Sequence, residues 1–467
     1  MARAKNEQRQ PAGAMTLTAW GGLVVAFLLC MAILNAVKGG SLPSETDLLL
    51  AALTLYAAAG AFYLGFGATG TEYYVKLASM ATWLGFIANS AALALRWYDA
   101  GRPPFATVYE MLLSSVWMLA LLTLIADKRF GVKVIATVTM PVAIVGMVLM
   151  LFLRTAPHPL VPLLQSTWLS VHVTLAILAY AACALSFALA MMFLIQDQMK
   201  TETILALSSA STLAIYAATV LTCFERWSGL SLNMWGSNQE SEILLFQSVR
   251  LSISIAVLGW LMVAALVVVG APLACYFLAR WTNDKRFLNL AHRGVVASIF
   301  LQAITLAVLL VRVDDGRPAA PAIDGSFPFQ LAANPFIVAG LAAGVFISLL
   351  FLLLVWRRQD LERLLPGADA LDRLTYRTIC FAFPLLTLTI ATGAYWANRT
   401  WGSYWSWDPK ETWAAITWLV YALYFHMRVT VGWRGRRAAY FVIAGFAVVI
   451  FTFFGVTYMF HGRHAFD

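Results

Sequence analysis

Long apolar runs recur along the whole chain of 467 residues, and they constrain the fold more than any other feature. A helix needs about 20 apolar residues to span the hydrocarbon core of a bilayer. Runs of this kind lie at about 17–37, 47–66, 76–96, 106–126, 132–153, 170–195, 202–222, 248–278, 294–312, 334–356, 376–396, 410–428 and 438–460. These runs are too long for strands, and apolar and polar residues do not alternate along them. We therefore predict an all-α, polytopic transmembrane helical bundle of about 13 spans.

The distribution of charge gives the predicted bundle an orientation. Only 12% of the residues are charged, and the net charge of +9 does not indicate nucleic acid, because the basic residues gather in alternate connections. With the N-terminus in the cytoplasm, these clusters all lie inside, as the positive-inside rule prefers. They are Lys128–Arg129, Lys285–Arg286, Arg357–Arg358 and Arg434–Arg437. The C-terminus is then extracytoplasmic.

The cysteines do not form a redox or metal motif. All five are dispersed, mostly within or beside the apolar runs, and no C-x-x-C occurs. Small buried side chains explain them, and a thiol–disulfide oxidoreductase is disfavoured.

Residues 401–413, WGSYWSWDPKETW, crowd large aromatic rings at a membrane surface, between two apolar runs. The rings belong to Trp401, Tyr404, Trp405, Trp407 and Trp413. Trp and Tyr enrich at both membrane interfaces, so an aromatic belt is one interpretation. A belt is usually scattered, however, and this density favours a platform for a flat apolar ligand with polar edges.

A helix is expected to begin directly after these rings. Asp408 is a good N-cap, Pro409 suits the first helical position, and Glu411 completes a capping box. A helix N-terminus favours anions, so rings beside it would suit a porphyrin with propionates. Arg399 and Lys410 flank the segment and could pair with propionates, although cations that snorkel to the interface explain them equally well.

These residues resemble a known family. Residues 401–418 are similar to the tryptophan-rich "WWD" signature of haem-handling membrane proteins. The Lys-Glu-Thr-Trp continuation resembles the CcsA/ResC branch, which belongs to the System II cytochrome c synthase. Three further segments also resemble family motifs, namely GRPPFATVYE at 101–110, LQSTWLSVHV at 164–173 and the tail at 454–464.

The resemblance implies roles for three histidines. His172 and His464 match the external haem-ligand positions of the family, and His426 matches its membrane histidine, which serves haem entering from the cytoplasmic side. Imidazole is a common axial ligand of haem iron. His461 stands three residues before His464 and is an alternative that the family motif does not select. His426 could instead be an interfacial residue beside Arg428.

The segment 101–110 departs from the family pattern. Arg102 and Thr107 stand where the family usually has His and Asn, so we assign this segment no ligand. Tyr109 and Glu110 open a span at the outer surface and remain a secondary candidate. An acidic residue in the first turn of a helix is favourable without any function.

The chain divides into four predicted parts: N-terminal membrane spans at 1–75, a family-like block with His172 at 76–200, four extra spans at 201–369 and the WWD haem-handling block at 370–467. Compact members of the family lack most of the third part. Four spans are an even number, so they leave the later topology unchanged. A structural or partner-docking role is our default interpretation of them.

Taken with the resemblance, this pattern implies the haem-handling subunit of a System II cytochrome c synthase (haem lyase) complex. Haem b, as substrate, would move outward and be presented on the platform for thioether attachment to an apocytochrome c with C-x-x-C-H. In the family, the second inner histidine comes from a ResB/CcsB partner, and this chain has no other histidine well placed in a span. The alternative is a haem exporter or a membrane b-type cytochrome without attachment activity.

Overall fold

The computed structural model of the chain describes most, but not all, of its residues. The described ranges are 43–130, 135–153, 165–223, 234–235, 248–249, 256–315, 335–356 and 358–460. The predicted span at 17–37 lies outside them.

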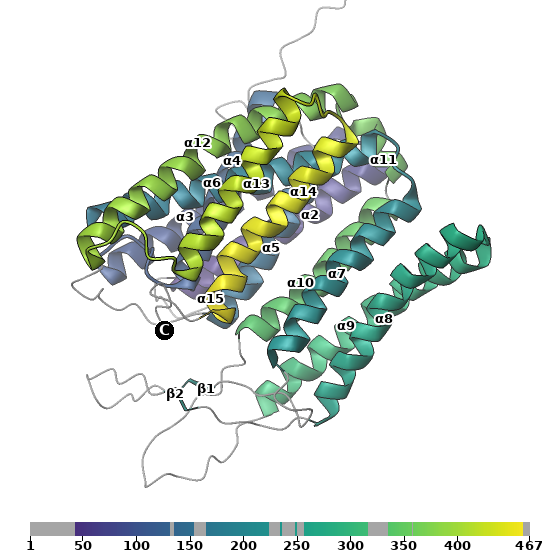
Figure 1. The fold of residues 1–467 in the computed structure, drawn as a ribbon, viewed down its shortest axis with the longest axis horizontal. Coiled ribbons are helices and arrows are strands. Elements are labelled where there is room, and N and C mark those ends of the chain that lie inside the picture. Colours follow the sequence, from purple (N-terminus) through teal and green to yellow (C-terminus); the bar gives the residue numbers. More distant parts are fainter. Residues whose placement is uncertain are drawn as a thin grey trace, which may run out of the picture.

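The described residues are almost entirely helical (Figure 1). The helices of the first half are α2 (Glu45–Thr69), α3 (Glu72–Ala100), α4 (Val108–Phe130), α5 (Ala136–Leu153), α6 (Thr167–Gln196) and α7 (Thr201–Cys223). Those of the second half are α8 (Ala256–Thr282), α9 (Lys285–Asp315), α10 (Pro335–Trp356), α11 (Arg358–Leu364), α12 (Ala368–Trp401), α13 (Pro409–Val429), α14 (Arg436–Ile450), the π-helix η2 (Phe451–Gly455) and α15 (Val456–Met459). Within these ranges, eight helices are long and apolar enough to cross a membrane. The predicted class, a multi-pass helical membrane bundle, is confirmed.

The predicted boundaries needed correction at several helices. The run at 248–278 does not begin as a helix, since Ser248 and Val249 (β2) pair antiparallel with Met234 and Trp235 (β1), and α8 begins at Ala256. The helix expected at 376–396 is α12, which has 34 residues and is therefore about 51 Å long. A bilayer core is about 30 Å thick. Polar turns at both ends continue the helix beyond the apolar stretch, and hydropathy cannot detect them.

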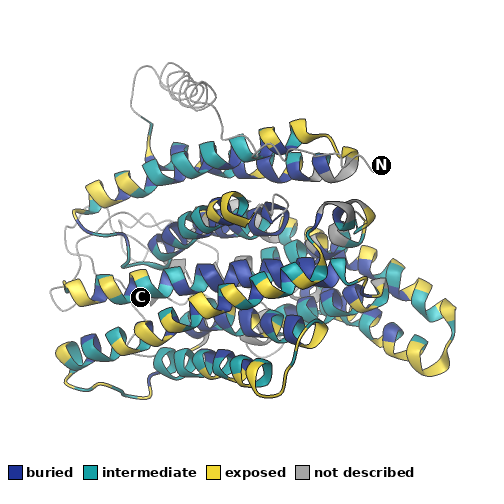
Figure 2. Cartoon of the chain, turned by 90° about the horizontal axis from the view of Figure 1, so that it is seen from above, coloured by how far each residue is buried: buried dark blue, intermediate teal, exposed yellow. Residues whose placement is uncertain are grey.

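Helix α6 forms the centre of the bundle, and α12 packs along most of its length. In its most apolar window α6 is 83% buried, more than any other candidate span of the described chain. The residues that α12 directs inward alternate in steps of three and four: Leu371, Thr375, Ile379, Ala382, Leu386, Thr389, Gly393 and Trp396. This is the heptad spacing of a coiled-coil seam. Figure 2 shows the buried positions gathered along the middle of the bundle, with exposed positions towards the helix ends and outer faces.

Helices α7 to α10 form a peripheral group beside this centre. Helices α8 and α9 pair at one edge of the molecule, and α7 and α10 lie between that pair and the rest (Figure 1). Buried hydroxyl and amide groups bond across the group: Thr212 Oγ1 lies 3.0 Å from Ser348 Oγ, and Gln302 Nε2 lies 3.3 Å from the same oxygen. The division at 201 and 369 remains a prediction.

Ionic contacts tie the helices together at the end where the basic clusters lie. Arg428 forms a bidentate ion pair with Asp372, at 2.7 and 2.5 Å, which joins the end of α13 to the start of α12. Arg436 of α14 pairs with Asp197 after α6. These ion pairs therefore lie at the end of the bundle that the positive-inside rule predicts to be cytoplasmic.

A buried charge network lies at the opposite end, between α2, α3 and α4. Glu110 is 0% exposed and lies 3.0 Å from both Nε and Nη2 of Arg96. Its other oxygen accepts a 2.9 Å hydrogen bond from Arg102 Nη1. Glu45 accepts a 2.6 Å hydrogen bond from the Tyr109 hydroxyl and lies 3.6 Å from Arg96 Nη1. Two carboxylates thus balance two guanidinium groups.

This network predicts a large stability loss for Glu110→Gln. The substitution keeps the side-chain shape but leaves the two arginines with one buried counter-charge, and breaking a buried pair costs about 3–5 kcal/mol. We expect a clear drop in the thermal unfolding midpoint of the purified protein in detergent.

Arg436→Gln is the matched control for this charge loss. Its pair with Asp197 is 50% and 34% exposed at the two side chains, and exposed pairs contribute about 0–1 kcal/mol. An equal drop in both variants would contradict the assignment of stability to the buried network.

Candidate functional site

The aromatic segment forms a capped turn between two helices. Helix α12 ends at Trp401, and Gly402 caps it with a positive φ of 73°. The predicted capping box is confirmed: the Asp408 side chain accepts from the first turn of α13, with Pro409 at the start and Glu411 completing the box. The Glu411 carboxylate also accepts a 2.7 Å bond from the Ser406 N–H. The start of α13 therefore fixes the loop that carries the rings.

Two of the five aromatic rings of the segment, those of Trp401 and Trp413, pack against aromatic side chains outside it. Trp401 packs edge-on against the buried Trp396, with ring centroids 4.9 Å apart. Trp413 packs on Phe451 of η2, at 4.4 Å.

The remaining three rings lie in the loop itself. Tyr404 is 60% exposed and Trp407 is 76% exposed. Trp405 is half-buried and meets Trp407 edge to face, with centroids 5.9 Å apart. Trp407 has a φ of 59°, a conformation that is uncommon for residues other than glycine. Tyr404 and Trp407 are therefore the two exposed rings of the segment, and the other three rings are half-buried.

His172 lies in the first turns of α6, against α12. Its Nδ1 is 2.8 Å from the carbonyl oxygen of Thr389. A Cβ added at Gly393 would lie 2.6 Å from His172 Cε1 and 2.7 Å from Nδ1. The imidazole therefore lies directly over the Gly393 backbone, in a space that exists because this residue has no side chain.

This contact determines the tautomer of His172. A carbonyl oxygen can only accept, so Nδ1 must carry the proton and donate it. The lone pair of the neutral ring is then on Nε2. Histidines that ligate metals almost always donate their other N–H to a carbonyl, a carboxylate or water, which fixes the ring orientation. His172 thus has the geometry of an oriented ligand.

An apolar cluster joins His172's helix to the aromatic turn. Its buried members are Leu169, Val173, Ile177 and Trp396, and the half-buried side chains packed on it are Phe105, Met118 and Trp401. Trp396 is 1% exposed, the largest fully buried side chain of the described chain. The cluster places the start of α6, the end of α12 and the loop after α3 in contact.

The two predicted propionate contacts lie beside the aromatic turn. The exposed Arg399 is stacked over the Tyr395 ring, with its Cζ 5.2 Å from the centroid. Tyr395 in turn meets Trp168 of α6 at 4.5 Å. The backbone N–H of Lys410 donates to Asp408 at 2.9 Å. Pairing of these cations with propionates stays a prediction.

His426 lies at the other end of the bundle, in the last turn of α13, and its side chain is exposed. Its neighbour Arg428 turns inward to Asp372, so the two side chains have different environments. His461 and His464 lie outside the described residues, and the choice between them stays a prediction.

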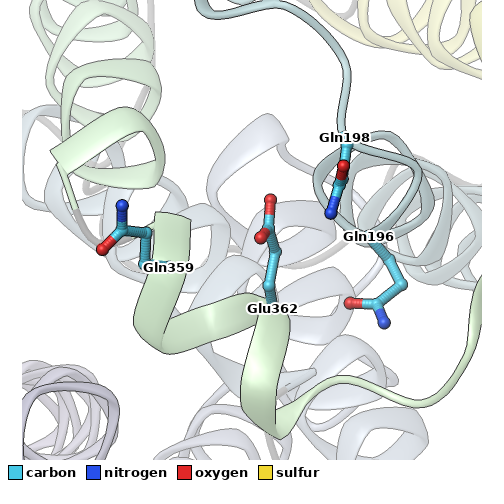
Figure 3. Close-up of a pocket in the computed structure, with 4 residues that line it drawn as sticks. All are labelled: Gln196, Gln198, Gln359 and Glu362. Atoms are coloured by element: carbon cyan, nitrogen blue, oxygen red, sulfur yellow. The ribbon is translucent and has the colours of Figure 1, made fainter.

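Other candidate sites among the described residues are few. No group of three His, Cys, Asp or Glu side chains could hold a metal ion within them. A polar cavity of about 330 Å³ lies between the end of α6 and α11, and Gln196, Gln198, Gln359 and Glu362 line it (Figure 3). Gln196 is 24 residues from His172 along α6, so about 36 Å separates this cavity from the aromatic end.

Sequence reasoning missed the surroundings of His172. Gly393 and Trp396 carry a weak signal, a glycine in a long helix and a tryptophan one turn before the aromatic segment. The Thr389 carbonyl carries no signal, because every residue has one. Only the packing of α6 on α12 brings these groups to the histidine.

Comparison with known proteins identifies the family. The family model described as cytochrome C assembly protein matches residues 105–290 and 274–464. The cytochrome c biogenesis protein CcsA of Gloeothece citriformis (strain PCC 7424) is 28% identical over 438 residues, which is 93% of this chain and 99% of that protein. The CcsA protein of Synechococcus sp. (strain JA-2-3B'a(2-13)) is 31% identical over 81% of each chain. The chain therefore belongs to the cytochrome c assembly protein family, in the CcsA group that its aromatic segment resembles.

Proposed function

We propose that this chain is the haem-handling subunit of a System II cytochrome c synthase. Membership of the family supports a role in cytochrome c biogenesis, and this role involves haem and an apocytochrome. In the proposal, haem b is the substrate, and the chain holds it at the extracytoplasmic face while its vinyl groups meet the two thiols of a C-x-x-C-H segment. The task of the protein is to position these reactants.

The observation that carries the proposal is the orientation of His172. Its ring is fixed by the Thr389 carbonyl on one side and by the Gly393 backbone below it. The lone pair on Nε2 suits a ferrous or ferric iron, since neutral imidazole is the usual haem ligand among histidines. Support also comes from its position at the same end of the bundle as the aromatic turn.

The rings and the tail complete the proposed outer site. Tyr404 and Trp407 offer exposed aromatic rings to the flat macrocycle, and the half-buried Trp401, Trp405 and Trp413 complete the platform. His464 supplies the second axial position in this proposal. Arg399 and Lys410 are the proposed propionate contacts, and Asp408 holds the start of α13.

The proposed inner site uses His426 and a second protein. A side chain exposed at this end of a membrane bundle meets lipid, interfacial water or a partner, and an ionisable group in lipid is costly. A ResB/CcsB-type subunit would remove this cost by covering His426 and adding a second histidine. We place the complex in a bacterial inner membrane or a thylakoid-type membrane, with haem entering from the cytoplasmic side.

His172→Ala tests the proposed function directly. The chain is co-expressed with a ResB-like partner and an apocytochrome c, and covalent haem on the cytochrome is measured. We expect the variant to lose nearly all product, because the iron loses one axial ligand. Added imidazole should restore part of the product by occupying the vacant position. A pure exporter would give haem outside the membrane without any covalent product, even in the unaltered complex.

His464→Ala and His461→Ala serve as the paired comparison within the same assay. We expect the first to behave like His172→Ala and the second to retain most of the product. The reverse result would move the second outer ligand to His461.

Gly393→Ala tests the space that the His172 ring occupies over the backbone of α12, without removing a ligand. The new methyl group would overlap the imidazole, so the ring must tilt away from the Thr389 carbonyl. We expect a loss of covalent product of at least tenfold and only small rescue by imidazole, because the displaced ring still blocks the position.

Gly60→Ala in α2 is the control for this substitution, because a Cβ there meets nothing within 4 Å. It should leave the product unchanged, since alanine is the better helix former. Normal activity of Gly393→Ala would show that the imidazole does not need this position.

His426→Ala tests the order of the two sites. Haem content of the purified complex is measured beside the covalent product, with Trp405→Ala and Trp407→Ala as variants of the outer surface. We expect His426→Ala to lower haem at both sites, and the tryptophan variants to lower only the outer haem. Full outer occupancy in His426→Ala would refute an ordered path from inside to outside.

A further inference from the structure

The loop between α3 and α4 is held unusually firmly at the outer end of the bundle. Glu110 accepts a 2.8 Å bond from the Ala106 N–H, in addition to its bonds from Arg96 and Arg102. Arg102 Nη1 also donates to the Pro103 carbonyl, at 3.2 Å. One buried carboxylate thus fastens both the backbone and a side chain of a seven-residue connection, 101–107.

Further contacts restrict the same loop. Pro103 and Pro104 limit its backbone angles, and the Phe105 N–H donates to the Pro103 carbonyl at 2.9 Å. Thr107 caps α4, because its Oγ1 accepts from the Glu110 N–H at 3.2 Å. Ser114 Oγ donates to the Pro104 carbonyl at 3.4 Å. These bonds restrain the backbone on both sides of Phe105.

Phe105 packs against the apolar cluster beneath the aromatic turn. That cluster contains Trp396, on which Trp401 rests, and it contains Leu169 and Val173, which flank His172 on α6. The Phe105 ring therefore packs on a cluster that joins the support of the aromatic loop to the helix turn that carries His172.

We propose that Phe105 is a positioning residue of the outer site, and that the Glu110 network exists to hold it there. This inference rests on the proposed function, because a positioning residue needs a site to position. The packing of Phe105 on the cluster does not depend on that function. The Phe105 ring wedges the end of α12 against the start of α6, so that Trp401 and His172 keep a fixed separation. No reacting group is assigned to Phe105 itself.

Phe105→Ala is the direct test, with hydrogen–deuterium exchange of the purified full chain as the readout. Removal of the ring leaves a cavity in the cluster, so we expect exchange in peptides covering 396–408 to become at least threefold faster. This measurement needs no bound haem. Phe105→Leu should give a smaller change in the same direction, and it replaces the alanine variant should that protein not be recovered from membranes.

Phe86→Ala is the matched control. Phe86 of α3 is also half-buried and contacts Trp117 of α4, with ring centroids 5.4 Å apart. It packs against the central core rather than against the cluster beneath the turn. We expect it to leave exchange at 396–408 unchanged. Equal exchange of Phe105→Ala and the unaltered chain would overturn the proposal, as would an equal effect of Phe86→Ala.

A second readout links the wedge to haem. In the co-expression assay, Phe105→Ala should lower covalent product at least fivefold and shift the absorption of any haem that remains bound, with a normal amount of chain in the membrane. An unaltered haem spectrum and an unaltered amount of product would show that Phe105 does not position the outer site. Absence of haem and product from the unaltered complex would refute the proposed function alone, because the exchange result stands independently.

Discussion

The packing of α6 against α12 is the interaction on which the rest of the structure depends. The inward side of α12 repeats every three or four residues over its whole length, and it includes small residues such as Ala382 and Gly393. Small residues let two helix backbones approach closely, which is how helices associate where water cannot drive them together. The same close approach leaves the backbone of α12 within hydrogen-bonding distance of a side chain on α6. His172 donates its Nδ1–H to the Thr389 carbonyl in this way.

The ion pairs at the two ends of the bundle differ in exposure and in the number of elements that they join. At the aromatic end, Glu45, Glu110 and their two arginines are almost completely enclosed, and they join three helices and one loop. At the other end, the ion pairs join only helix termini, and one of them, between Arg436 and Asp197, is 50% and 34% exposed at its two side chains. An enclosed network tolerates little movement, because any separation leaves a charge without compensation. Rigidity is therefore concentrated where the proposed site must hold a ligand in one orientation.

The aromatic segment combines anchoring and exposure within a few residues. The helix ends hold Trp401 and Trp413 against Trp396 and Phe451, and the short capped loop leaves Tyr404 and Trp407 open. A loop with exposed rings would normally be mobile. Here the capping box of Asp408 and Glu411 fixes it at its far end, and the cluster with Phe105 supports its near end.

The class of the fold, the aromatic segment, the helix start at Asp408 and the family could all be predicted from the sequence. These features are local: apolar runs, a capping motif and a short motif can each be recognised without knowing what lies opposite. The sequence also singled out His172, but only by resemblance. The tertiary structure decided which groups surround that ring, since the Thr389 carbonyl and the Gly393 backbone lie more than 200 residues away along the chain. It also decided that Glu110 is a buried anchor rather than an ordinary acidic residue at a helix start. Packing between distant helices sets both environments, and no pattern within a single segment encodes it.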